Sequence, residues 1–148
     1  NACEGVGCDM SYDFEGGVIP NAFGTGGDIG FGVMPGSGRG GEGSAAQSGG
    51  ITNNQESTMS LTVDAGDGAT LSFWYKVSSE GNWDWLSVYV DGAEVDAWSG
   101  DVDWTEVILE LDAGEHTILW VYEKDGSASG GNDTGWIDDV SFVNACLP

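Results

Sequence analysis

Six short segments of this sequence alternate apolar with polar residues and are rich in β-branched and aromatic side chains. A period of two places alternate side chains on opposite faces of a β-strand, and no stretch shows a helical period over three turns. The segments are MSLTV (59–63), LSFWYKV (71–77), LSVYV (86–90), EVILEL (106–111), TILWVY (117–122) and WIDDVSFV (136–143).

Glycine and aspartate separate these segments. Asp91-Gly92 is typical of a two-residue hairpin, and DAGDGA (64–69) and DAGE (112–115) are typical of tight connections. About eight to ten strands at this spacing predict an all-β fold, a two-sheet antiparallel jelly-roll sandwich. The length of 148 residues predicts one such domain over residues 1–148.

Residues 24–50 differ in composition, because twelve of them are glycine. Such a segment can be a flexible linker. However, Ile29, Phe31, Val33 and Met34 are spaced through its first half. We therefore expect a Gly-rich segment of long loops and short edge strands that lies against the sandwich within the same domain.

The formal net charge of −22 arises from 25 acidic and only 3 basic residues. A surface this negative repels nucleic acid and anionic membranes, so no nucleic-acid partner is expected. The longest apolar run is about six residues, far short of the ~20 of a spanning helix, so no membrane insertion is expected. The same surface attracts divalent cations and indicates a calcium-rich or saline exterior.

The cysteines, Cys3, Cys8 and Cys146, lie at the two ends of the chain. If the first and last strands pair antiparallel, the numbers of facing residues have a constant sum. Setting Glu15 opposite Asp139 gives 154, which is also the sum for Cys8 and Cys146. This register favours a Cys8–Cys146 disulfide and an oxidising compartment, with one thiol left over. The alternatives are a Cys3–Cys146 bond, a Cys3–Cys8 bond and three free thiols.

Two adjacent aspartates, Asp138 and Asp139, interrupt the last predicted strand. Because successive strand residues face opposite sides, we expect one carboxylate to point inward and the other outward. Asp13 and Glu15 share one face of the opening segment SYDFE (11–15) if it forms the paired strand. These carboxylates, with carbonyls from the Gly-rich segment, predict a Ca²⁺ site. The alternative is that the two aspartates cap turns and accept backbone N–H groups without metal.

Aromatic residues are the candidates for ligand binding, because an indole plane flanked by polar groups suits a sugar ring. Trp74 and Lys76 lie opposite the apolar face of their segment, as do Trp85 and Tyr89 in the next. Two strands thus carry a second aromatic face, which is either a binding platform or a small core covered by the Gly-rich segment. Trp83, in a loop, is expected to be exposed.

Catalysis has little support in the sequence. The single histidine, His116, is expected to be a turn or surface residue. Glu106, Glu110 and Asp112 fall on one face of a predicted strand, as a carboxylate pair for glycoside hydrolysis would require. A solvated outer face of an acidic protein is the better explanation of these residues, and we expect no enzyme.

Five stretches carry a resemblance to a known class: YDFEGGVIP, SAAQSGGITNNQESTMSLTV, LSFWYKVSSEGNWDWLSVYVDG, WSGDVDW and AGEHTILWVYEKDGSASGGNDTGWIDDVSF. From Tyr12 to Val143 the chain resembles the MAM-like and carbohydrate-binding jelly-roll modules of large extracellular bacterial proteins. The resemblance implies a structural calcium held by Glu15 and Asp138, whereas the cysteine register favours Asp139.

The sequence therefore predicts a non-catalytic, calcium-stabilised jelly-roll module that is secreted or displayed at the cell surface and recognises a polysaccharide or glycan. The alternative is a structural or adhesive cell-surface or filament domain that contacts other surface proteins or itself.

Overall fold

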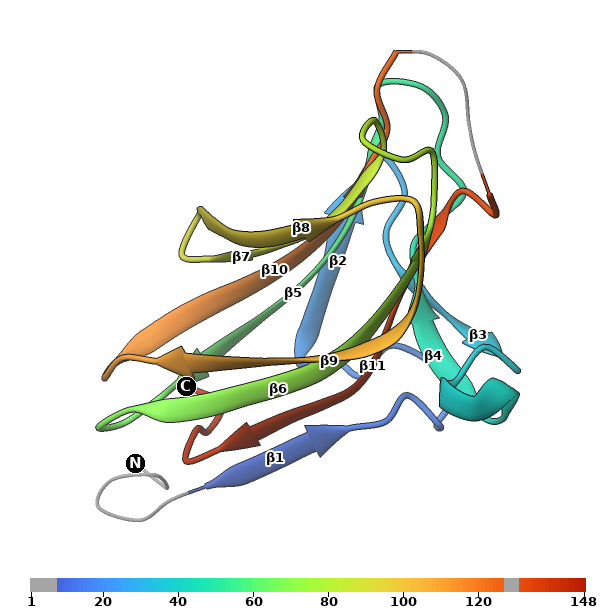
Figure 1. Ribbon diagram of the computed structural model, residues 1–148. Helices are drawn as coiled ribbons and strands as arrows, with labels where there is room; N and C mark the ends of the chain where they lie inside the picture. Colours follow the sequence, from blue (N-terminus) through green and yellow to red (C-terminus); the bar gives the residue numbers. More distant parts are fainter. Residues whose placement is uncertain (1–7, 127–130) are drawn as a thin grey trace.

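A computed structural model describes residues 8–126 and 131–148, which form two β-sheets packed face to face (Figure 1). One short 3₁₀ helix, η1 (Arg39–Gly41), lies in the Gly-rich segment. The strands are β1 (Asp9–Tyr12), β2 (Phe23–Gly27), β3 (Gly32–Pro35), β4 (Ser44–Gln47), β5 (Glu56–Asp64), β6 (Ala69–Ser78), β7 (Trp85–Val90), β8 (Ala93–Trp98), β9 (Asp101–Leu111), β10 (Glu115–Glu123) and β11 (Thr134–Val143).

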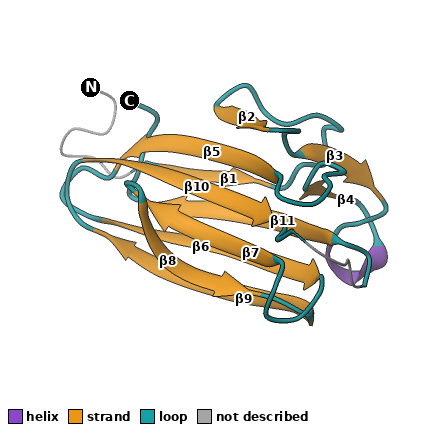
Figure 2. Cartoon of the chain, turned by 90° about the horizontal axis from the view of Figure 1, so that it is seen from above, coloured by secondary structure: helices purple, strands orange, loops and turns teal. Residues whose placement is uncertain are grey.

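Sheet A has the strand order β3-β4-β11-β6-β9, with β1 also paired to β11. Sheet B has the order β2-β5-β10-β7-β8, and every pairing in both sheets is antiparallel. In Figure 1, sheet B lies above sheet A, and Figure 2 shows the layers from above. The predicted two-sheet antiparallel sandwich is confirmed.

All six segments with alternating residues form strands, within β5, β6, β7, β9, β10 and β11. The turn at Asp91-Gly92 joins β7 to β8, and both residues have positive φ, 53° and 84°. This is the backbone that a two-residue hairpin of type I′ requires. The strand β8 was missed because its sequence, AEVDAW, is mostly exposed and does not alternate clearly.

The core lies between the sheets and is built from the apolar face of each strand. In β6, Leu71, Phe73 and Val77 are buried in it, and Trp120 of β10 meets Phe73 edge to face at 5.6 Å. Each such side chain contributes about 1.5–3 kcal/mol when removed from water. Side chains that alternate with these residues therefore lie on the outer face of their sheet.

The Gly-rich segment supplies β2, β3, η1 and β4. β2 is one edge of sheet B, β3 is one edge of sheet A, and β4 lies between β3 and β11. Phe31, Ala45 and Ala46 of this segment are buried. The segment therefore packs on the sandwich and extends both sheets.

The strand β11 changes its neighbour halfway along one edge. Trp136 and Ile137 pair with β4, whereas residues 140–143 pair with β1. On its other edge, the register with β6 shifts between Asp138 and Ser141, and Asp139 has a φ of +48°. The two aspartates therefore lie at a bulge, beside the point where β4 gives way to β1.

The terminal strands pair antiparallel, but the predicted register was wrong by two residues. β1 covers residues 9–12 instead of the expected 11–15. Its residues and those they face in β11 have numbers that add to 152, as for Asp9 and Val143, instead of the expected 154. The Cys8–Cys146 disulfide is nevertheless present, with Cα atoms 5.4 Å apart. Asn144, with a φ of +70°, breaks the strand geometry and brings Cys146 beside Cys8. Cys3 lies outside the described residues.

Candidate functional site

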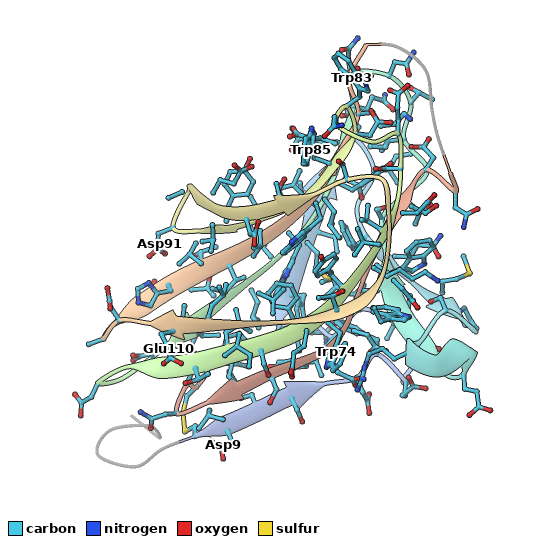
Figure 3. All side chains as sticks on the ribbon, viewed as in Figure 1. Asp9, Trp74, Trp83, Trp85, Asp91 and Glu110 are labelled. Atoms are coloured by element: carbon cyan, nitrogen blue, oxygen red, sulfur yellow. A yellow bond between two sulfur atoms is a disulfide. The ribbon has the colours of Figure 1, made fainter. Side chains whose placement is uncertain are left out.

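The predicted ligand residues lie on opposite faces of the sandwich. Trp74 and Lys76 are on the outer face of sheet A, because they alternate with core residues of β6. Strand β7 belongs to sheet B, and its residues Leu86 and Val88 face the core. Trp85 and Tyr89 are therefore on the outer face of sheet B. Figure 3 shows Trp74 beside η1, and Trp83 and Trp85 toward one end of the sandwich. Trp83 is 60% exposed, and the five residues do not form one platform.

A depression of about 580 Å³ opens on the outer face of sheet A. Trp136 of β11 and Trp104 of β9 line it, and Lys76 stands between them because β6 lies between these strands. The β3–β4 connection forms another side. The lining residues are Met34, Pro35, Gly36, Ser37, Gly38, Arg39, Gly40, Gly41, Gln47, Lys76, Asp103, Trp104 and Trp136. This depression combines aromatic planes with polar groups.

Two polar groups of the depression, those of Lys76 and Gln47, contact the ring of Trp136. Lys76 Nζ lies 5.2 Å from the centroid of the Trp136 ring, within cation–π range. The indole Nε1 of Trp136 donates a hydrogen bond to Gln47 Oε1 at 2.8 Å. Sequence reasoning missed Trp104, Trp136 and Gln47 as site residues. Their proximity depends on the pairing of four strands, which no local pattern reports.

Arg39 connects this depression to a second one. Its guanidinium carbon lies 4.1 Å from the centroid of the Trp74 ring, and its Nε lies 2.7 Å from Asp139 Oδ2. The second depression, of about 460 Å³, is lined by Asp13, Glu15, Arg39, Gly40, Glu42, Asp138 and Asp139. We call it the acidic pocket, because it holds five carboxylates and one guanidinium.

The acidic pocket brings together all four residues predicted to hold calcium: Asp13, Glu15, Asp138 and Asp139. The expectation that the two adjacent aspartates face opposite sides was wrong, because the bulge turns both toward this pocket. Asp13 and Glu15 lie after β1, in a turn where the N–H of Glu15 donates to Asp13 Oδ1 at 3.0 Å. They are therefore not on one face of a strand.

Asp138 is the most buried of these carboxylates, with 3% of the residue exposed. Its Oδ1 accepts the N–H of Asp139 at 2.8 Å, and its Oδ2 accepts the N–H of Arg39 at 3.2 Å. Burial raises the pKa of Asp138 to about 6, and the charges of Asp139 and Glu15 add to this, while both N–H groups oppose it. A buried carboxyl among further carboxylates fits the oxygen donor set of a hard cation.

A second acidic cluster lies near the loop end of the sandwich. Carboxylate oxygens of Glu80, Asp84 and Asp125 all lie within 4.8 Å of one another, an arrangement that can hold a metal ion. Lys124 Nζ lies 3.2 Å from Asp84 Oδ2 and 2.7 Å from Asp133 Oδ1. Burial raises the pKa of Glu80, and the charges of Asp125 and Asp84 add to this. Asp125 lies in the Asp-, Ser- and Gly-rich loop 124–133, whose composition allows a second calcium site or a plain hairpin loop, but no local pattern brings Glu80 and Asp84 to it.

The histidine is engaged in structural hydrogen bonds. His116 Nδ1 lies 2.6 Å from Asp91 Oδ2, and Nε2 lies 2.8 Å from the carbonyl oxygen of Asp112. Because both partners are acceptors, both ring nitrogens donate when the ring is protonated. The hydrogen bond to Asp91, followed by that to Asp112, raises the pKa of His116. The ring therefore has no free nitrogen to act as a general base.

Comparison with known proteins shows the fold of this chain. No protein-family model matches the sequence, and no curated protein matches it either. The structure is similar to the K1 cleaved adhesin domain of Lys-gingipain from Porphyromonas gingivalis, with a TM-score of 0.68 at 16% identity. That match covers 92% of this chain and 98% of the adhesin domain.

Two carbohydrate-binding modules have the same fold. A CBM61 structure in complex with β-1,4-galactotriose matches with a TM-score of 0.58 at 19% identity, over 88% of this chain and 92% of that one. The CBM22-1–GH10 modules of Clostridium thermocellum xylanase 10B, complexed with xylohexaose, match with a TM-score of 0.59 at 15% identity. This match covers 91% of our chain and 28% of the xylanase chain. The fold is therefore the one found in adhesin and carbohydrate-binding domains.

Proposed function

We propose that this protein is a non-catalytic, calcium-stabilised recognition module that binds a saccharide in the depression on the outer face of sheet A. The observation that carries the proposal is the lining of this depression. Trp104 and Trp136 flank Lys76, and Gln47 is fixed by a hydrogen bond to one of the indoles. Aromatic planes suit the C–H faces of sugar rings, and adjacent amide and ammonium groups suit their hydroxyls.

Calcium is proposed for the acidic pocket, with Asp138 and Glu15 as its main ligands and Asp13 and Asp139 beside them. When bound, the ion supplies positive charge that neutralises the carboxylates, and it has no chemical role in ligand binding. The buried carboxyl of Asp138 supports this proposal, since burial of a carboxylate is unfavourable without a cation. The pocket lies against η1, so an ion here stabilises the connection that lines the saccharide site.

An extracellular location is part of the same proposal. The Cys8–Cys146 disulfide is expected in an oxidising compartment. Within the described residues, no helix has the length and apolar character needed to cross a membrane. A net charge of −22 is compatible with a saline or calcium-containing exterior, where cations screen the repulsion between carboxylates.

The test is saccharide binding by two matched variants. Trp104→Ala removes an aromatic plane from the depression, and Trp85→Ala removes an equally half-buried tryptophan from the outer face of sheet B. We expect a hit in a screen of soluble and insoluble polysaccharides with calcium present. The Trp104→Ala variant should bind at least about tenfold more weakly, because a central aromatic hot spot contributes about 2 kcal/mol or more, and tenfold corresponds to about 1.4 kcal/mol.

The Trp85→Ala variant should bind like the parent protein. The opposite pattern would move the saccharide site to sheet B, where Trp85 and Tyr89 lie. If the folded, calcium-loaded protein binds no saccharide, the proposal is wrong. The adhesive function, with contacts to other surface proteins or to itself, would then be tested by measuring association of the protein with itself.

A further inference from the structure

The few cationic groups of this chain are unevenly distributed. Of the 3 basic residues, Arg39 and Lys76 both line the depression on sheet A. The third, Lys124, is buried and forms ion pairs with Asp84 and Asp133 in the second acidic cluster. In a chain with 25 acidic residues, the depression therefore gathers two of the three cations, while Asp103 also lines it and Asp139 pairs with Arg39. Such a site attracts an anionic group more strongly than the rest of the surface does.

Lys76 differs from the other two basic residues in its surroundings. Among the described residues, no carboxylate oxygen lies within 4.0 Å of its Nζ, which lies over the Trp136 ring instead. Asp103 also lines the depression and adds a negative charge there, but among the described residues it forms no ion pair within 4.0 Å with Lys76. Within the described part of the chain, the ammonium of Lys76 thus has no direct ion pair and can form one with a ligand.

Two other polar side chains of the depression, Gln47 and Arg39, also offer hydrogen-bond donors, whereas Asp103 offers only acceptors. The bond from Trp136 occupies Gln47 Oε1, which leaves the amide NH₂ of Gln47 as a donor. Arg39 uses its Nε for Asp139, which leaves the terminal nitrogens of its guanidinium. A group that supplies only acceptor atoms matches these donors best, and charge-assisted hydrogen bonds are the strong ones.

We infer that the depression selects saccharides that carry an anionic substituent, a carboxylate or a sulfate, and that Lys76 binds this substituent. The inference rests on the proposed function, because it assigns the ligand class of the same site. Trp104, which is half-buried, supplies contacts that any sugar ring can make, while the buried Trp136 supports Lys76 and Gln47. Lys76, assisted by Gln47 and Arg39, supplies the contacts that distinguish an acidic sugar from its neutral counterpart.

The experiment compares three oligosaccharides of one length by isothermal titration calorimetry: trigalacturonate, neutral galactotriose and a sulfated galactotriose. Calcium and salt concentrations are kept the same for all three. We expect at least one anionic trimer to bind at least tenfold more tightly than the neutral trimer. Comparison of trigalacturonate with the sulfated trimer identifies the preferred anion. In the Lys76→Met variant the preference should fall below about threefold, while Lys76→Arg should retain it.

Binding of the neutral trimer serves as the control for the site itself. Lys76→Met should weaken binding of the neutral trimer much less than binding of the preferred anionic trimer, because a hydroxyl loses one hydrogen bond whereas an anion also loses its charge partner. Equal binding of neutral and anionic trimers would overturn the inference and leave the proposed function standing. A preference for the anionic trimer that survives in Lys76→Met would also overturn the inference but not the proposed function. Equal weakening of all three ligands in Lys76→Met would do the same. If none of the trimers or screened polysaccharides binds, both the inference and the proposed function are wrong.

Discussion

Replacing Asp138 with Asn is expected to stabilise the metal-free protein at neutral pH. The carboxyl is almost completely buried, and burial raises its pKa from 3.8 to about 6. Between these two values the folded state holds more protons than the unfolded state, so the free energy of unfolding falls as pH rises. Above about pH 6 the charged side chain therefore costs the fold about 3 kcal/mol, at 1.36 kcal/mol per pKa unit.

The amide of Asn removes this cost but loses one hydrogen bond. Its Oδ1 can still accept the N–H of Asp139, whereas its NH₂ faces the N–H of Arg39, which Asp138 Oδ2 accepts in the native protein. A lost hydrogen bond costs about 1 kcal/mol. The net expectation is a stabilisation of about 2 kcal/mol, or roughly 4–8 °C in Tm for a domain of this size. At about pH 4 and below the stabilisation should vanish.

Calcium should reverse the sign of this effect. An ion that binds only the folded state adds RT ln(1 + [L]/Kd) to the stability of the native protein, and Asp138→Asn should lose most of that gain. The assay is urea unfolding followed by tryptophan fluorescence, on metal-stripped protein at about pH 4 and pH 7.5 and again with calcium. Asp139→Asn is the control, because that side chain is 37% exposed and its removal should change metal-free stability little.

Two results would refute the reasoning. The first is equal destabilisation of the metal-free Asp138→Asn variant at both pH values, which would mean that the carboxyl is charged at no net cost in the fold. The second is an equal gain of stability from calcium in the native protein and in the variant, which would place the ion elsewhere. The cluster around Glu80, Asp84 and Asp125 would then be the next site to test.

Two further predictions concern stability. Lys124→Met should lower the free energy of unfolding by about 3–5 kcal/mol, because the substitution leaves the fully buried carboxylate of Asp84 without its cation. Urea unfolding measures this loss. The double variant Lys124→Met/Asp84→Asn should recover part of the lost stability. Gly49→Ala should destabilise by about 1–3 kcal/mol, because a Cβ at that position would overlap with Ile29 Cγ2. Gly50→Ala is the matched control, since no atom lies within 4 Å of its new Cβ, and equal Tm values for the two variants would contradict the packing of this segment.

Local patterns predicted the strands well, because alternation of side chains is a property of each strand alone. They did not predict the sheet to which each strand belongs. β6 and β7 are consecutive in sequence, yet β6 pairs with β11 and β9 in sheet A, whereas β7 pairs with β10 and β8 in sheet B. This choice depends on partners far away in the chain. It placed Trp74 and Trp85, which the sequence grouped together, on opposite faces.

The acidic residues show a second limit of strand periodicity. Alternation predicts opposite faces for Asp138 and Asp139 only while β11 continues regularly. The change of neighbour from β4 to β1 and the shift against β6 interrupt it there. The resemblance to carbohydrate-binding modules nevertheless pointed to Glu15 and Asp138, which do line the same pocket. A family motif identifies such residues even at a bulge, because it depends on residue identity. Periodicity fails there, because it assumes a regular strand.

The Gly-rich segment is where composition alone was least informative and where the candidate sites are built. Gly40 and Gly41, with φ of 80° and 79°, adopt a backbone conformation that residues with side chains rarely accept. They follow Arg39 directly and end η1 within one turn. The guanidinium is thereby held over Trp74 with its Nε on Asp139, between the acidic pocket and the aromatic depression. A segment with the composition of a linker therefore contributes to both pockets, because its glycines allow the backbone that places their shared cation.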